Sequence, residues 1–166
     1  SKHQSFFDTV VWSQLIPNAA YVMKEELLSQ PIFGWFIRHI DVVALDRKAG
    51  LSSLKKLLVD SQAKADQGLP VVIFPEGTRT RPGERGRYHP GVAAMYEKLN
   101  LPVVPVGTDS GVFWDQGLKG LKQGVITVAI QPAIQPGLDK RAFLTEVSEC
   151  IETSSLSLFE QAQLGG

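Results

Sequence analysis

Cysteine is almost absent from this chain of 166 residues, and so are long apolar runs and an excess of either charge. One cysteine, Cys150, excludes a disulfide within the chain and any metal site built from several cysteines. No run approaches the roughly 20 apolar residues of a membrane-spanning helix. Because the 17 basic and 17 acidic side chains balance, no broad basic field favours nucleic acid as a partner. Any anion site must therefore come from a local cluster.

Short apolar runs alternate along the chain with segments whose apolar positions have helical spacing. The apolar runs predict strands at 20–23, 42–45, 69–74, 103–106 and 125–130. The helical spacing predicts helices at 6–15, 31–39, 52–65, 91–99 and 140–164. Uniformly apolar strands that alternate with helices are typical of a sheet covered on both faces. We therefore expect a single-domain α/β fold with a mixed, mostly parallel sheet flanked by helices.

The segment FPEGTRTR, at 74–81, places an acid, a glycine and two arginines directly after a predicted strand. In sheets of this kind, ligands bind beyond the carboxyl ends of the strands. Gly77 lets a ligand approach the backbone, Thr78 offers a hydroxyl, and the fork of Arg79 suits phosphate or carboxylate oxygens. Glu76 can orient an arginine or accept a hydrogen bond from a substrate hydroxyl. The segment predicts an oxyanion site, with a surface loop and a salt bridge as the alternative.

Two further cations, Lys24 and Arg47, also follow predicted strands. Together with Arg79 they would form a positive pocket in an otherwise neutral protein. Taken singly, each is more typical of a solvated surface, and Arg47 directly after Asp46 is typical of a surface ion pair. The pocket and the solvated surface both stay open on these residues alone.

A histidine and an aspartate, His3 and Asp8, stand five positions apart. On one continuous helix that separation turns the two side chains about 140° apart, so they would not meet. They meet if His3 lies in the loop before the helix and Asp8 lies in its first turns, with Ser5 capping the helix. A carboxylate bound to one imidazole nitrogen leaves the other nitrogen as a general base. The spacing alone is a weak signal, because most such pairs carry no function.

The other reactive side chains have plainer interpretations. His39 lies in an apolar segment and is expected as a packed core or edge residue. His89 lies in a polar loop and is expected in solvent, with an approach to the phosphate end as the alternative. Cys150 falls within a predicted helix and is interpreted as a small buried side chain rather than a nucleophile. Since His3 and Asp8 have no convincing third ligand, no metal site is predicted.

Four blocks follow one another along the chain: HQSFFD at 3–8, VVALDR at 42–47, FPEGTRTR at 74–81 and LPVVPV at 101–106. In this order they resemble the 1-acylglycerol-3-phosphate acyltransferases, of the bacterial lysophosphatidate acyltransferase type. KEELLSQPIFGWF, between the first two blocks, is also similar to that family. The likeness runs from His3 to at least Gly111, and more loosely to the last helix. The third block is the most specific, and the order and spacing of all four make the resemblance strong.

Two features depart from the family pattern. Lys2 stands where the family often has asparagine, so the local positioning of His3 is expected to differ. The hydrophobic N-terminal segment usual in the family is missing, and residues 1–166 are expected to be its acyltransferase catalytic domain.

The resemblance implies transfer of an acyl group from acyl-CoA or acyl-carrier protein to the 2-hydroxyl of 1-acylglycerol 3-phosphate, which gives phosphatidate. It implies that His3, held by Asp8, deprotonates the hydroxyl, and that no metal or cofactor is needed beyond the thioester co-substrate. It also implies a glycerol phosphate site formed by Lys24, Arg47, Glu76, Gly77, Thr78 and Arg79, with Pro105 in support.

Both substrates are amphipathic, so the resemblance implies a membrane surface as partner, at the cytoplasmic face of the bacterial inner membrane. Candidates for an interfacial patch are the aromatic segments at 35–37 and 113–114, although burial is the more usual fate of such side chains. Nucleic acid is not an expected partner.

Three other functions stay open on the sequence. The first is an acyltransferase for another lyso-lipid acceptor, such as a lyso-ornithine lipid. The second is a phospholipid-binding relative without catalysis, and the third is a phosphate-ester hydrolase. An assay of several acceptors separates the first from lysophosphatidate transfer. The effect of His3→Ala tests the second, and release of free phosphate tests the third.

Overall fold

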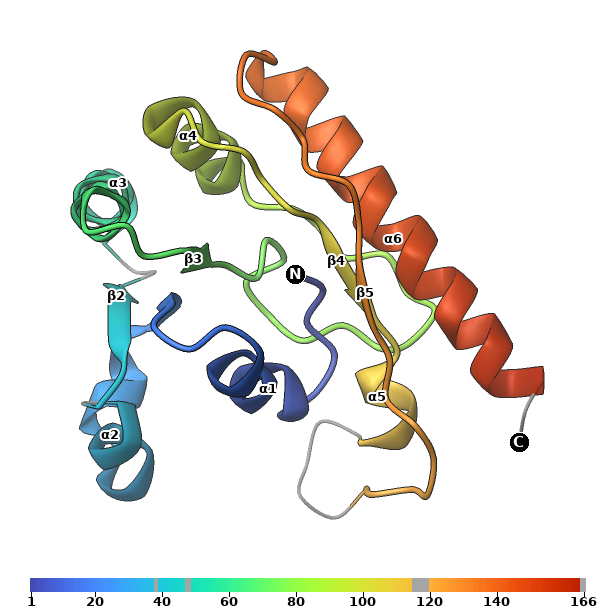
Figure 1. Cartoon of the computed structure of the whole chain (residues 1–166). Coiled ribbons are helices and arrows are strands. Elements are labelled where there is room, and N and C mark those ends of the chain that lie inside the picture. Colours follow the sequence, from blue (N-terminus) through green and yellow to red (C-terminus); the bar gives the residue numbers. More distant parts are fainter. Residues whose placement is uncertain (38, 47–48, 115–119, 165–166) are drawn as a thin grey trace.

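The computed structural model describes residues 1–37, 39–46, 49–114 and 120–164. Helices lie on both sides of short strands, and the N-terminal segment runs through the middle of the molecule (Figure 1). That segment is held by its backbone, because the Lys2 N–H donates to the carbonyl of Val106 at 2.9 Å. The first residues of the chain are therefore an internal part of the fold.

The strands form two sheets. In the first, β1 (Ala20–Lys24) is central and pairs in parallel with β2 (Asp41–Leu45) and with β3 (Val71–Val72). In the second, β4 (Val106–Thr108) pairs antiparallel with β5 (Val128–Ile130). Because strands and helices alternate along the chain and the larger sheet is parallel, the predicted mixed α/β fold with flanking helices is confirmed.

Helices cover both faces of the parallel sheet. Successive residues of β1 point to opposite faces, so Tyr21 and Ala20 contact helices on different sides. On one side α1 (Phe7–Leu15) packs against Tyr21. On the other side α3 (Gly50–Asp66) and α4 (Pro90–Leu99) pack against Ala20. The buried side chains on this second face are Ala20, Val43, Leu57 and Met95. The sheet is thus the middle layer of a three-layer core.

The long helix α6 (Lys140–Leu164) runs along one flank, beside α4 and β4 (Figure 1). Its predicted apolar stripe is buried, and the ring of Phe143 stacks on Tyr96 with centroids 3.9 Å apart. Gly107 of β4 lies so close to α6 that a Cβ at that position would meet Ser154 Oγ. Helix and strand are therefore in tight contact.

Three predicted strands are shorter than their apolar runs, and in the run 125–130 only Val128–Ile130 pairs. The run 69–74 pairs only at Val71–Val72, because the chain then turns and the Gly77 N–H donates to the carbonyl of Phe74 at 3.0 Å. In the run 103–106 only Val106 joins β4, because Pro102 and Pro105 have no N–H to donate to a strand ladder. The strand predicted over 103–106 is therefore interrupted: Val103 pairs with Ile134 alone, and the ladder of β4 begins only at Val106.

The connections contain shorter helices. The 3-10 helix η1 (Glu25–Ser29) and the helix α2 (Pro31–Ile37) lie between β1 and β2, and α5 (Ser110–Phe113) follows β4. Of these, the sequence predicted α2 alone. Within the described ranges, no helix has both the length and the apolarity that crossing a membrane requires.

Candidate active site

A cavity of about 640 Å³ lies at the carboxyl ends of the three parallel strands. Lys24, Leu45 and Ile73, which end or directly follow those strands, all line it. Apolar side chains from the sheet, α2 and α3 form much of its wall, among them Val22, Ile37, Leu54 and Leu57. The sequence predicted a site at this edge of the sheet, and this is where the cavity is found.

Five of the predicted site residues line this one cavity: His3, Lys24, Gly77, Thr78 and Arg79. They come from the N-terminal segment, the end of β1 and the turn after β3. The histidine and the arginine, far apart in sequence, therefore face the same space. That shared space is the geometric condition that a combined base and phosphate site requires.

His3 lies in the loop before α1, and Asp8 lies in the first turn of that helix. Nδ1 of His3 donates to Oδ2 of Asp8 at 3.3 Å, and the imidazole stacks on Phe74 with ring centroids 4.3 Å apart. The His3 side chain is 12% exposed, and the described residues give its Nε2 no hydrogen-bond partner. The loop-then-helix arrangement predicted for this pair is the one found.

Asp8 is buried and is held by backbone donors as well as by the imidazole. Its Oδ2 accepts the N–H of Gln4 at 2.6 Å and the N–H of Ser5 at 2.8 Å. An acidic side chain in the first turn is also stabilised by the helix dipole. Ser5 Oγ accepts the Phe7 N–H at 3.1 Å, but the N-cap of α1 is Phe6, so the prediction that Ser5 caps the helix is wrong. This arrangement keeps a carboxylate in place behind the imidazole.

The turn after β3 holds the backbone of His3. The His3 N–H donates to Oε2 of Glu76 at 2.9 Å, and the His3 carbonyl accepts the Thr80 N–H at 2.9 Å. Gly77 has φ of +65°, a left-handed conformation that favours glycine. The FPEGTRTR segment is thus a support for the histidine as well as a wall of the cavity.

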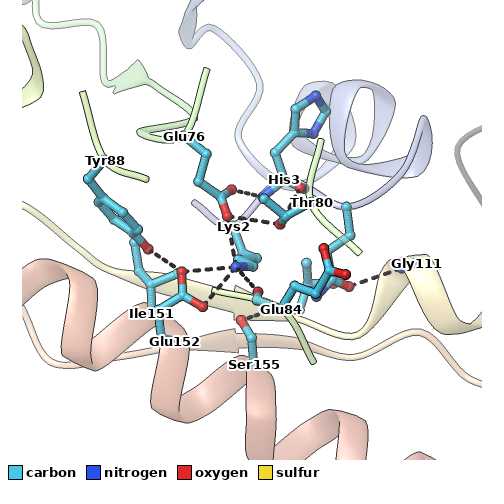
Figure 2. A network of polar contacts seen from close by, with 12 residues as sticks. Lys2, His3, Glu76, Thr80, Glu84, Tyr88, Gly111, Ile151, Glu152 and Ser155 are labelled. Atoms are coloured by element: carbon cyan, nitrogen blue, oxygen red, sulfur yellow. Dashed lines mark hydrogen bonds and ion pairs between the residues drawn. The ribbon is translucent and has the colours of Figure 1, made fainter. Parts of the chain in front are cut away.

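Glu76 is buried beneath the cavity and does not line it. Its Oε1 contacts Lys2 Nζ at 2.7 Å and accepts the Thr80 hydroxyl at 2.9 Å, while its Oε2 accepts the His3 N–H (Figure 2). The structure therefore does not bring this carboxylate together with the other residues predicted for the glycerol phosphate. Its position favours a supporting part over direct contact.

The remaining predicted residues lie elsewhere. Arg47 is outside the described residues. Pro105 is buried away from the cavity, and its carbonyl accepts the Gln131 N–H at 3.0 Å. Arg85 and Arg87, farther along the loop after β3, are exposed.

Four polar residues of the cavity wall, Thr9, Tyr21, Ser53 and His89, were not predicted there. His89 is exposed, as expected for a loop residue, and directly precedes α4, whose first residues also line the cavity. Thr9 directly follows Asp8 in the first turn of α1. This place beside a predicted site residue is the sequence signal that could have identified Thr9.

Cys150 takes no part in the cavity. Burial raises the pKa of its thiol, and the carboxylates of Glu146 and Glu149 add to the shift, so the thiol is a poor nucleophile. Among the described residues, no group of three histidine, cysteine or acidic side chains is arranged to hold a metal ion.

The candidate interfacial aromatics have different environments. Trp35 is 68% exposed, whereas Ile37 in the same helix is buried and lines the cavity. Phe113 and Trp114 are partly buried, and the Trp114 ring lies 5.8 Å from the ring of Phe6. An interfacial patch that includes Trp35 stays a prediction.

Comparison with known proteins gives a family match. The model of the Acyltransferase family matches residues 1–109. A 1-acyl-sn-glycerol-3-phosphate acyltransferase of Pseudomonas aeruginosa is 35% identical over 134 residues, which are 81% of this chain and 52% of that protein. A protein of the same name from Helicobacter pylori is 34% identical over 63% of this chain and 44% of its own length. The chain thus spans about half the length of these relatives.

A solved structure shares the fold. The crystal structure of the 1-acyl-sn-glycerophosphate (LPA) acyltransferase, PlsC, from Thermotoga maritima superposes with a TM-score of 0.78 at 23% sequence identity. The match covers 95% of this chain and 64% of that one.

Proposed function

The chain belongs to the Acyltransferase family, and on that premise we propose that it transfers an acyl group from a thioester to the 2-hydroxyl of 1-acylglycerol 3-phosphate. The relatives from Pseudomonas aeruginosa and Helicobacter pylori carry the name of this activity. The product would be phosphatidate, and the thioester would be an acyl-CoA or an acyl-carrier protein.

One observation carries the proposal: an imidazole backed by a carboxylate and an arginine face the same cavity. The acceptor hydroxyl is only two carbons away from the phosphoryl group. A base that activates this hydroxyl must therefore lie beside the site that binds the phosphate. In this proposal Arg79, Thr78 and Lys24 bind the phosphate, and Arg47 joins them. The apolar walls suit a fatty acyl chain, and the cavity volume is in the range of small-molecule sites.

The reaction proposed for His3 is a direct transfer. Nε2 takes the proton of the acceptor hydroxyl as its oxygen attacks the thioester carbonyl carbon. The tetrahedral intermediate collapses, the carbon–sulfur bond breaks, and Nε2 returns the proton to the departing thiolate. The products are an ester and a free thiol. Asp8 holds the imidazole in the required tautomer and stabilises the imidazolium between the two proton transfers.

The amphipathic substrates favour work at a membrane surface, which we take to be the cytoplasmic face of a bacterial inner membrane. The exposed Trp35 is the side chain on which we base this part of the proposal. Sedimentation with vesicles of anionic phospholipid tests it, and Trp35→Ser should bind them less than the unaltered protein.

Release of free thiol from acyl-CoA in the presence of 1-acylglycerol 3-phosphate tests the proposed activity. We expect His3→Ala to lower the rate by at least about 100-fold, the usual scale for loss of a general base. The matched control is His39→Ala, because His39 is exposed and does not line the cavity. Equal rates in His3→Ala and the unaltered protein would exclude the role of His3.

Three outcomes would favour the other functions. They are read by thiol release, by lysophosphatidate binding and by release of free phosphate. Faster thiol release with a lyso-ornithine lipid than with lysophosphatidate would make the former the acceptor. Lysophosphatidate binding without thiol release from any donor would indicate a binding protein. Release of phosphate without thiol would indicate a hydrolase.

A further inference from the structure

Lys2 is buried at the centre of a polar network, with 1% of its side chain exposed. Its Nζ lies 2.7 Å from Oε1 of Glu76 and 2.8 Å from Oε2 of Glu152, and it donates to the carbonyl of Glu84 at 3.0 Å. Figure 2 shows these contacts converging on the one ammonium group. A buried cation needs such partners, because desolvation of a charge is costly.

The network contains two carboxyl groups and one ammonium. The Tyr88 hydroxyl donates to Oε1 of Glu152 at 3.1 Å. Burial raises the pKa of Tyr88 well above its usual range, and the adjacent Glu152 and Glu76 carboxylates raise it further, so the phenol stays a proton donor. Without Lys2, Glu76 and Glu152 would lose the cation that lies between them.

Glu76 connects the network to the N-terminal segment that carries His3. Lys2 contacts one oxygen of this carboxylate, and the backbone N–H of His3 donates to the other at 2.9 Å. The orientation of the carboxylate therefore depends on the ammonium, and the position of the His3 peptide depends on the carboxylate. Lys2 is the residue directly before His3, so the chain is held on both sides of that peptide.

Three distant parts of the chain meet here: the N-terminal segment, the turn and loop after β3, and α6. The loop closes over the network from one side. Glu84 supplies its carbonyl, and a Cβ at Gly86 would lie 2.5 Å from Cγ of Glu76. Helix α6 closes it with Glu152, which is buried beside Ile151.

We propose that Lys2 is a positioning residue for the histidine. Anchored on Glu152, its ammonium holds Glu76 so that the second carboxylate oxygen fixes the His3 peptide and, with it, the imidazole opposite Asp8. The catalytic consequence rests on the proposed acyl transfer, whereas the positioning itself does not. Asparagine, which is often found before the histidine in the family that the sequence resembles, is too short and carries no charge to serve this network.

Lys2→Met tests the proposal, because methionine keeps most of the length and removes the charge. The control is Lys64→Met, which removes a partly exposed lysine that is paired with Asp41 outside this network. The first measurement is the nitrogen and proton NMR spectrum of the ring atoms of protein labelled in histidine. The chain has three histidines, and His39, which is exposed and does not line the cavity, serves as the internal reference.

We expect Lys2→Met to shift the ring signals of His3 and to leave those of His39 unchanged, and Lys64→Met to shift neither. The second measurement is thiol release. Lys2→Met should lower kcat by about 10- to 100-fold, the scale of a displaced catalytic group, with KM for both substrates within about twofold. Glu152→Gln should have a smaller effect in the same direction, because Glu76 remains paired; exposed Glu149→Gln on the same helix is its control.

The double variant Lys2→Met/Glu152→Gln separates positioning from stability. It removes one of the two carboxylates that Lys2→Met leaves without their cation. We expect it to unfold at a higher temperature than Lys2→Met while the His3 signals stay shifted and kcat stays low. This variant also serves where Lys2→Met alone does not fold. Unchanged His3 signals in either folded variant would overturn the proposal. Unchanged kcat per folded molecule would leave Lys2 a purely structural residue and overturn it as well. Failure of the unaltered protein to release thiol would refute the proposed function alone, because the NMR measurement needs no turnover.

Discussion

At the scale of single residues, His3 is held by four neighbours. Asp8 binds its Nδ1, Phe74 stacks on its ring, Glu76 accepts its N–H and Thr80 donates to its carbonyl. The sequence predicted the first contact, because a loop followed by a helix brings residues five apart together. It could not predict the contacts with the turn after β3, because these depend on packing between segments more than 70 positions apart.

Asp8→Asn tests the role of the carboxylate. Asparagine can still accept the backbone N–H groups of Gln4 and Ser5, so we expect the fold to persist. The charge that favours the imidazolium is lost and the tautomer is no longer fixed, so kcat should fall by about 100-fold or more. Steady-state kinetics beside a thermal unfolding curve measures both effects. A kcat within about threefold of the unaltered protein would contradict this role.

Tyr88 gives a prediction for stability at alkaline pH. Its pKa is raised in the folded state, chiefly by burial, so its contribution to stability is complete below the ordinary tyrosine pKa of about 10 and is lost as the pH rises further. The unfolded chain then releases a proton that the folded one keeps. This group should lower the free energy of unfolding by up to about 1.4 kcal/mol per pH unit.

Urea unfolding of the protein and of Tyr88→Phe between pH 8 and 11 measures this contribution. The variant should be less stable at pH 8, because it lacks the hydrogen bond to Glu152, and its stability should fall less steeply above pH 10. The raised pKa of Tyr21 affects both proteins alike and cancels in the comparison. Equal slopes would show that Tyr88 ionises no later in the folded protein than in the unfolded chain.

At the scale of secondary-structure elements, the helices were predicted better than the strands. Helix α6 has the predicted bounds, and its apolar stripe is buried at Phe143, Val147 and Ile151. Strands β3, β4 and β5 are short, and an apolar run does not reveal which of its residues will find a partner. The burial of Glu152 could have been predicted, because this glutamate lies directly after Ile151 of the apolar stripe. A charge at a buried helical position predicts a buried partner.

Gly107→Ala tests the contact between β4 and α6. The added methyl group would meet Ser154 Oγ and would lie 3.0 Å from Ser154 Cβ, so helix and strand would have to separate. We expect a loss of about 1–3 kcal/mol in the free energy of unfolding. Gly91→Ala is the control, because its methyl group would make ordinary contacts and alanine favours the helix. Equal stability of the two variants would mean that α6 shifts at little cost.

At the scale of the whole molecule, the site depends on where the segments meet. The cavity joins the N-terminal segment, the ends of three parallel strands and the starts of α3 and α4. The rule for parallel sheets predicted its location from the sequence. Its volume and its apolar walls could not be predicted, since they depend on how closely the helices pack against the sheet.

The central proposal is that His3 and the phosphate-binding residues act in a single cavity. Thiol release with 1-acylglycerol 3-phosphate and with 1-acylglycerol, which lacks the phosphate, tests it in the unaltered protein and in Arg79→Ala. Arg79→Ala should raise KM for the phosphate-bearing acceptor by about 10-fold or more and leave the rate with the other acceptor unchanged. Exposed Arg87→Ala should change neither. Equal losses with both acceptors, or no loss with either, would contradict the claim.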